Sequence, residues 1–140
     1  MRLDDIFTLM IDWGMMMDKR FHHVFKLYMA KMLKRRRVMI IYDADKPIAI
    51  LTFFVTDDYR SLARKNEWSC PKDQERGRQI LIDKLLCKDY SFSMRRHLQE
   101  LFENAFPWAD EAHYLRAPYD RHVRIKRRSQ RRQLCLRNTP

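Results

Sequence analysis

The sequence predicts a mixed α/β (α+β) fold, a single sheet with helices on both faces. Two observations support this prediction. Apolar residues recur at helical spacing over the first 36 residues, and runs rich in β-branched and aromatic residues fill 37–56 and 79–87. The second run is followed by an amphipathic helix and another strand, which is typical of a parallel crossover. The expected order is helix, helix, strand, strand, strand, helix, strand, strand.

Two N-terminal helices are expected over about 2–16 and 18–36, with a break near Gly14. Their apolar positions are Leu3, Ile6, Phe7, Met10 and Met17, then Phe21, Val24, Phe25, Tyr28, Met32 and Leu33. The run Met15 to Met17 is interpreted as adaptable core filling rather than as a binding surface, because methionine fits irregular gaps.

A β-hairpin is expected in RVMIIYDADKPIAILTFFVT, residues 37–56, with a four-residue turn at Asp43 to Lys46. Pro47 is tolerated there if it opens the second strand, since the first position needs no ladder N–H. The polar stretch 57–78 is a long connection with a helical turn near 59–64. Trp68 within it either anchors the loop to the body or covers a site as part of a lid.

The segment QILIDKLLC, residues 79–87, is the next expected strand, and a helix follows from an N-cap at Ser91 or Ser93 to Pro107. Its buried stripe comprises Met94, Leu98, Leu101, Phe102 and Ala105. Two short strands, EAHYLR (111–116) and RHVRIKR (121–127), complete the order.

Composition narrows the functional classes. The length of 140 residues predicts one domain, 1–127, followed by a basic tail at 128–140. The net charge of +11 either favours an anionic partner or serves solubility. Three widely spaced cysteines indicate free thiols in a reducing compartment. Neither a signal peptide nor an apolar run of the ~18 residues that span a bilayer is found. A soluble cytoplasmic protein is therefore expected.

The predicted order, with the strand–loop–helix junction at 79–105, resembles the GNAT acyltransferase superfamily. Within it, the toxin-activating lysine acyltransferases look most similar. The similarity lies in the hairpin and in the strand–helix–strand segment ILIDKLLCKDYSFSMRRHLQELFENAFPWADEAHYLR. Within that segment the shared residues are the pairs Ile82-Asp83 and Phe106-Pro107 and the final Arg116. The superfamily's glycine-containing phosphate loop is absent, because no glycine occurs between Arg78 and Pro140.

This resemblance implies an N-acyltransferase that uses an acyl-CoA or an acyl-carrier protein. The backbone of the third strand would hold the pantetheine arm, and the following loop and helix start would bind the pyrophosphate. The implied cofactor residues are Lys84, Leu85, Leu86, Cys87, Lys88, Ser91, Ser93, Arg95 and Arg96.

Acyl transfer to an amine needs a proton acceptor and a donor for the leaving thiolate. Asp83 is the candidate base, or the group that orients one, and Tyr119 the candidate acid. The alternatives are that Asp83 faces solvent or pairs with a basic neighbour, and that Tyr119 is a packed corner residue. No metal site is expected, because the histidines and cysteines lack ligand spacing.

A rival hypothesis is a non-catalytic basic module that binds nucleic acid on the same scaffold, as in a nucleoprotein assembly such as a virus particle. Its candidate phosphate contacts are Arg124, Lys126, Arg127, Arg128, Arg131 and Arg132. The block KMLKRRR, residues 31–37, adds a second cluster of cations. A merely solvated tail is the alternative interpretation of these residues.

Overall fold

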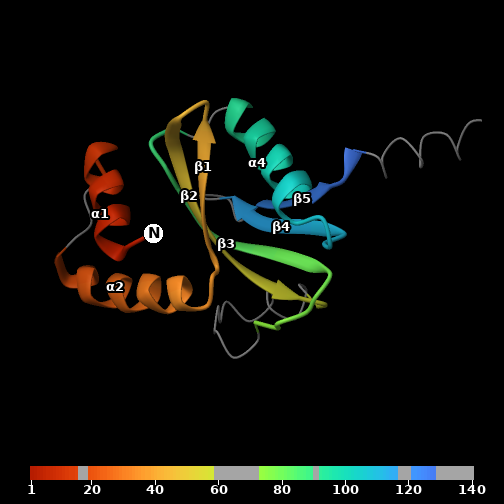
Figure 1. Ribbon diagram of the computed structural model, residues 1–140, viewed down its shortest axis with the longest axis horizontal. Helices are drawn as coiled ribbons and strands as arrows, with labels where there is room; N and C mark the ends of the chain where they lie inside the picture. Colours follow the sequence, from red (N-terminus) through yellow and green to blue (C-terminus); the bar gives the residue numbers. More distant parts are fainter. Residues whose placement is uncertain (16–18, 59–72, 90–91, 117–120, 129–140) are drawn as a thin grey trace, which may run out of the picture. The chain divides into compact units, whose positions relative to one another are not determined.

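The computed structural model describes residues 1–15, 19–58, 73–89, 92–116 and 121–128 (Figure 1). Its helices and strands are α1 (Leu3–Asp12), α2 (Lys19–Lys34), β1 (Val38–Asp43), β2 (Lys46–Thr56), β3 (Gln79–Cys87), α4 (Phe92–Ala105), β4 (Glu111–Arg116) and β5 (Arg121–Lys126). This order confirms the predicted α+β fold. Trp68, Tyr119, the expected turn at 59–64 and the tail beyond Arg128 lie outside the described residues.

The strands form a mixed five-stranded sheet in the order β1-β2-β3-β4-β5. β1 and β2 are antiparallel, β3 and β4 parallel, and β4 and β5 antiparallel. The parallel register covers three residue pairs, from Gln79 opposite Glu111 to Leu81 opposite His113. The predicted crossover through α4 is therefore present, and its ladder is short relative to the nine residues of β3.

The chain forms two compact units. The first comprises Met1–Phe53 and Lys84–Ser91, and the second Phe54–Asp83 and Phe92–Pro140. Among the helices of the described residues, none has the length and apolar character that a bilayer crossing requires.

The core of the first unit is a cluster of Ile6, Met10, Met29 and Ile50 from α1, α2 and β2. The half-buried side chains packed against it include Met15. The position of Met15 agrees with the predicted core filling. The other methionines of the run, at 16 and 17, lie outside the described residues. α1 ends just before Gly14, whose φ of 69° is a left-handed conformation that glycine adopts without a steric penalty.

The hairpin forms with the expected turn, since Asp43 pairs with Lys46 and Ala44 takes a φ of 53°. The second strand opens at Lys46, so Pro47 is its second residue rather than its first. The register shifts between Ile41 and Tyr42, and Tyr42 is the residue paired with Pro47. Such an irregularity accommodates a proline, which has no N–H to donate to the ladder.

Thr52 is a fully buried polar residue of the first unit. Its Oγ1 lies 2.7 Å from the hydroxyl of Tyr28 and accepts the backbone N–H of Lys84 at 3.1 Å. A buried hydroxyl with two partners satisfies a polar side chain that would otherwise be costly to bury.

Thr52→Val should therefore lower the free energy of unfolding by about 1 kcal/mol, because it leaves the Lys84 N–H without its acceptor. Urea denaturation checks this. Tyr28→Phe, which leaves that N–H satisfied, is the matched control and should cost less. An equal or larger loss in Tyr28→Phe would contradict the account of Thr52.

The second unit contains α4, β4, β5 and the adjoining parts of β2 and β3. Met94, Leu98 and Phe102 form the buried stripe of α4 as predicted, while Leu101 and Ala105 are half-buried. α4 begins at Phe92, so Ser93 lies inside its first turn and is not the N-cap; this alternative was wrong.

A tight chain crossing also belongs to the second unit. A Cβ atom on Gly77 would lie 2.7 Å from both the carbonyl carbon and the oxygen of Thr56. Carboxylates fix the flanking backbone: Asp73 accepts the N–H of Val55 at 2.7 Å, and Asp57 accepts the N–H of Arg78 at 3.0 Å. Glycine at 77 is thus required by close backbone approach.

Candidate functional site

A polar cluster lies on β4 and β5 of the second unit. Side chains alternate along a strand, so Glu111 and His113 share one face of β4. The antiparallel register pairs His113 with Arg124, which puts Arg124 and His122 on that same face. Gln79 of β3 is opposite Glu111. Three strands therefore contribute to the cluster.

His113 is the centre of the cluster and is completely buried. Its Nε2 lies 2.9 Å from Oε1 of Glu111, and its Nδ1 lies 2.9 Å from Nε2 of His122. The two imidazole rings are stacked with centroids 5.1 Å apart. Glu111 also accepts Nε2–H of Gln79 at 3.1 Å and lies 3.6 Å from Nε of Arg124. These contacts fix both histidine rings.

Burial is the main cause of the electrostatic state of His113. It lowers the pKa of His113 from 6.5 to about 4, because an apolar environment disfavours the imidazolium ion. The hydrogen bond to Glu111 and its charge act in the opposite direction, while His122 and Arg124 lower the pKa further. His113 is consequently a neutral imidazole at pH 7.

The segment Lys84–Cys87, predicted to hold pantetheine, is the end of β3 and belongs to the first unit. The N–H of Lys84 bonds Thr52, and Leu86 packs against the apolar cluster of that unit. Leu85 and Cys87 are half-buried. Burial, and secondarily the charge of Asp89, raises the pKa of the Cys87 thiol, so this cysteine is not an activated nucleophile.

The residues predicted to bind phosphate are exposed where they are described. Lys88 follows β3 in the first unit, and Ser93, Arg95 and Arg96 lie on the first turns of α4 in the second. Ser91 lies outside the described residues, as does the candidate acid Tyr119. The first turn of α4 contains no acidic residue.

Asp83, the predicted base, is a half-buried residue of β3 in the second unit. One of its carboxylate oxygens, Oδ1, is buried. Asp83 follows Leu81 by two residues, and Leu81 is the partner of His113, so alternation places Asp83 on the face of the polar cluster. The site role of Asp83, and its pairing with a basic neighbour, stay predictions.

Two of the arginines predicted to contact nucleic acid make contacts with α4 and the residues that follow it. Nε of Arg127 donates to the carbonyl of Ala109 at 2.9 Å, and its Nη atoms donate to the carbonyls of Glu103 and Phe106. Its guanidinium lies 4.9 Å from the ring centroid of Phe102. Arg128 makes a charge-assisted pair with the carboxylate of Glu103. Arginine at a helix C-terminus satisfies carbonyls that lack intrahelical partners.

Arg127→Ala should lower the free energy of unfolding by about 2 kcal/mol, because it removes the guanidinium donors to these carbonyls, of which only that of Phe106 is known to keep another, the N–H of Ala109, and removes the contact with Phe102. Thermal or urea denaturation checks this. Lys126→Ala, the adjacent cation, is the matched control and should change stability little. An equal effect of the two variants would contradict a capping role.

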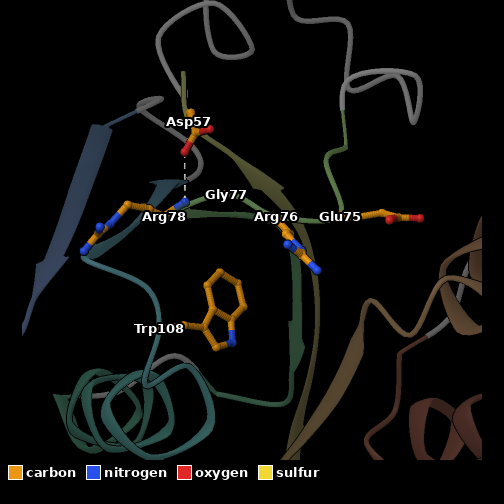
Figure 2. A pocket seen from close by; sticks show the side chains of 6 residues that line it. All are labelled: Asp57, Glu75, Arg76, Gly77, Arg78 and Trp108. Carbon is orange, nitrogen blue, oxygen red and sulfur yellow. Dashed lines mark hydrogen bonds between the residues drawn. The ribbon is translucent and has the colours of Figure 1, made fainter.

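A pocket of about 640 Å³ lies elsewhere on the second unit, lined by Asp57, Glu75, Arg76, Gly77, Arg78 and Trp108. Figure 2 shows the indole of Trp108 facing the segment that carries Arg76 and Gly77. Trp108 is 47% exposed and packs edge-on against Phe106. The guanidinium of Arg78 is bound to Asp110 at 2.9 and 3.1 Å. Two carboxylates and two guanidinium groups balance in the lining, which therefore favours neither sign of ligand charge.

The sequence did not identify the polar cluster. His113 and His122 lie on separate strands nine residues apart, and their proximity depends on the β4–β5 register. The alternation of EAHYLR and of RHVRIKR shows which residues of each strand share a face, but the register that brings the two histidines together is needed as well. Within the described residues, no group of three or more histidine, cysteine or carboxylate side chains could hold a metal ion.

Comparison with known proteins finds no family model, no curated protein and no solved structure that matches the chain.

Proposed function

We propose that this protein is an N-acyltransferase that takes its acyl group from an acyl thioester such as an acyl-CoA. The observation that supports the proposal is the parallel β3–α4–β4 crossover, whose ladder covers only three residue pairs. Its element order also agrees with the resemblance to the GNAT superfamily noted in the sequence. In that superfamily two parallel strands diverge at this point and a pantetheine arm lies along the exposed backbone.

The short ladder has a direct physical meaning for ligand binding. β3 extends six residues beyond Leu81, its last residue in the printed register with β4, to Cys87. Strand backbone that a ladder does not cover can hydrogen-bond an extended ligand, as an added strand does. Pantetheine contains two amide groups and is chemically suited to such pairing.

The start of α4 is suited to an anion. A helix N-terminus carries partial positive charge, and its first turn normally favours acidic residues. Here the first turn contains no acid, and Arg95 and Arg96, the fourth and fifth residues of the helix, are exposed. This unfavourable placement of cations is offset if a phosphate binds there, which replaces the missing glycine loop with side-chain charge.

Isothermal titration calorimetry tests the proposal. Acetyl-CoA and longer acyl-CoAs should bind saturably, and Arg95→Gln/Arg96→Gln should weaken binding by about tenfold, equivalent to the loss of about 1.4 kcal/mol. Lys31→Gln/Lys34→Gln removes the same charge from α2 and is the matched control. Absence of a binding signal at millimolar acyl-CoA would overturn the proposal.

Nucleic-acid binding is the second candidate, favoured by one specific observation. Lys31, Lys34, Arg35 and Arg36 are all exposed at the C-terminal end of α2. About four phosphate contacts would give salt-sensitive, sequence-independent binding. Retention on duplex DNA should then fall steeply with salt, and should fall in Lys31→Gln/Lys34→Gln or on deletion of 128–140. Retention that is absent or independent of salt would eliminate this candidate.

A further inference from the structure

We propose that the outward face of α2 binds the surface of an anionic phospholipid bilayer, with the helix lying in the plane of the headgroups. Two exposed apolar side chains, Val24 and Leu27, would enter the boundary between headgroups and acyl chains. The cations Lys31 and Lys34 would contact lipid phosphates. This inference is independent of the proposed acyl transfer and goes beyond it.

Spacing along the helix places these four residues on one stripe. Val24, Leu27, Lys31 and Lys34 follow one another at intervals of three, four and three positions, at which the side chains of an α-helix share a face. All four are exposed, and Val24 and Leu27 keep 63% and 60% of their surface open to solvent. These four residues are called the outward stripe of α2.

The opposite side of α2 is buried in the core of the first unit. Met29 and Met32 are completely buried, and the hydroxyl of Tyr28 lies 2.7 Å from Oγ1 of Thr52. These contacts fix the rotation of the helix about its axis. The apolar residues of the outward stripe cannot turn inward unless the buried methionines turn outward, so packing of the core does not explain them.

Charge indicates the kind of surface that the outward stripe fits. α2 contains no acidic residue in its sixteen positions, and the exposed cation Arg36 follows its end. Acidic residues of the first unit lie on other elements, for example Asp4 and Asp5 in α1 and Asp43 in β1. Apolar side chains beside cations match an anionic bilayer, because lysine stems lie along its apolar boundary while their ammonium groups stay among the headgroups.

The apolar half of the outward stripe distinguishes lipid from nucleic acid as the partner. Phosphates of a duplex would engage Lys31 and Lys34, but sequence-independent contacts to phosphate and sugar leave Val24 and Leu27 without an apolar partner. The headgroup boundary of a fluid bilayer accepts both kinds of side chain. The cations alone fit either polyanion, whereas the complete stripe favours lipid.

Co-sedimentation of the full chain with large unilamellar vesicles tests the proposal. Vesicles of phosphatidylcholine and phosphatidylserine, mixed at about 3:1, should bind the protein about tenfold or more tightly than vesicles of phosphatidylcholine alone. Lys31→Gln/Lys34→Gln should lower the partition coefficient on the mixed vesicles by about tenfold, and added salt should lower it as well. Equal binding to both kinds of vesicle, or binding to neither, would overturn the proposal.

Substitutions of Leu27 test insertion into the bilayer. Leu27→Ser should weaken binding to the mixed vesicles by about tenfold, because an apolar side chain no longer leaves water. Leu27→Trp should strengthen binding, since tryptophan is favoured at the depth of the headgroups. Ile11→Ser is the matched control, because Ile11 is 73% exposed but lies in α1 beside Asp12, and it should bind as the wild type does.

Two further measurements on Leu27→Ser separate the outcomes. Its urea denaturation midpoint should equal that of the wild type, because the side chain is exposed, and its retention on duplex DNA should not change. Wild-type vesicle binding in Leu27→Ser, or an equal loss in Leu27→Ser and Ile11→Ser, would overturn the proposal. A loss of DNA retention in Leu27→Ser as large as the loss of vesicle binding would assign the outward stripe to nucleic acid and overturn it too.

Discussion

Gly77→Ala should lower the free energy of unfolding by about 3 kcal/mol or more, the largest effect expected of any single methyl group in this chain. The new Cβ would lie 2.7 Å from the carbonyl carbon and oxygen of Thr56 and 2.9 Å from its nitrogen. Backbone atoms cannot move aside as a flexible side chain can. The segment is further held by Asp57, which accepts the N–H of Arg78. Urea denaturation followed by circular dichroism measures the loss.

Gly14 is the only other glycine of the chain. Gly14→Ala is the matched control, because it tests the cost of backbone conformation without a steric clash. A Cβ at Gly14 would meet no atom within 4 Å, but φ is 69° there. The expected cost is about 1–2 kcal/mol, which is the penalty of the left-handed conformation alone. A loss in Gly77→Ala no larger than that in Gly14→Ala would contradict the close crossing with Thr56.

Acidification from pH 6.5 to pH 4 should remove on the order of 2–3 kcal/mol of stability through His113 alone. The pKa of His113 is about 4 in the folded chain, against an ordinary value of 6.5. Between these values the unfolded chain binds a proton that the folded chain does not, so stability rises with pH. The contribution is complete above pH 6.5 and is lost as pH falls to about 4.

Two variants isolate this effect in equilibrium unfolding measured at a series of pH values. His113→Gln should lose the slope between pH 6.5 and 4, while His23→Gln should retain it. Arg128 lowers the pKa of Glu103 from 4.5 to about 2, so the stability supplied by that carboxylate is lost only in the lower window between those values. Equal slopes in the wild type and His113→Gln between pH 6.5 and 4 would contradict a buried neutral His113.

Local patterns predicted most of the fold. β3 and β4 have the predicted bounds, Gln79–Cys87 and Glu111–Arg116, because each is a compact apolar or alternating run between clear breaks. Of the two N-caps predicted for α4, Ser93 was wrong because the helix begins at Phe92, while Ser91 lies outside the described residues. Local preference identifies that a helix is present more securely than where it begins.

The candidate site could not be derived in the same way, because it depends on register. The sequence singled out Asp83 on β3, whereas the tightest polar cluster joins Glu111, His113 and His122 across β4 and β5. Pairing of strands is a tertiary property and is not encoded in residue spacing. Likewise, Arg127 was predicted to contact nucleic acid, and its bonds to the carbonyls of Glu103, Phe106 and Ala109, far from it in the sequence, could not be derived from residue spacing.

Hydrogen–deuterium exchange with and without saturating acyl-CoA tests the central claim most directly. Amides of β3 beyond Leu81 should gain protection when the thioester binds, because the pantetheine arm would lie along them; the exception is Lys84, whose N–H already bonds Thr52. Amides of β1 should not change. Exchange at the end of β3 that is the same with and without acyl-CoA would contradict the proposed acyltransferase.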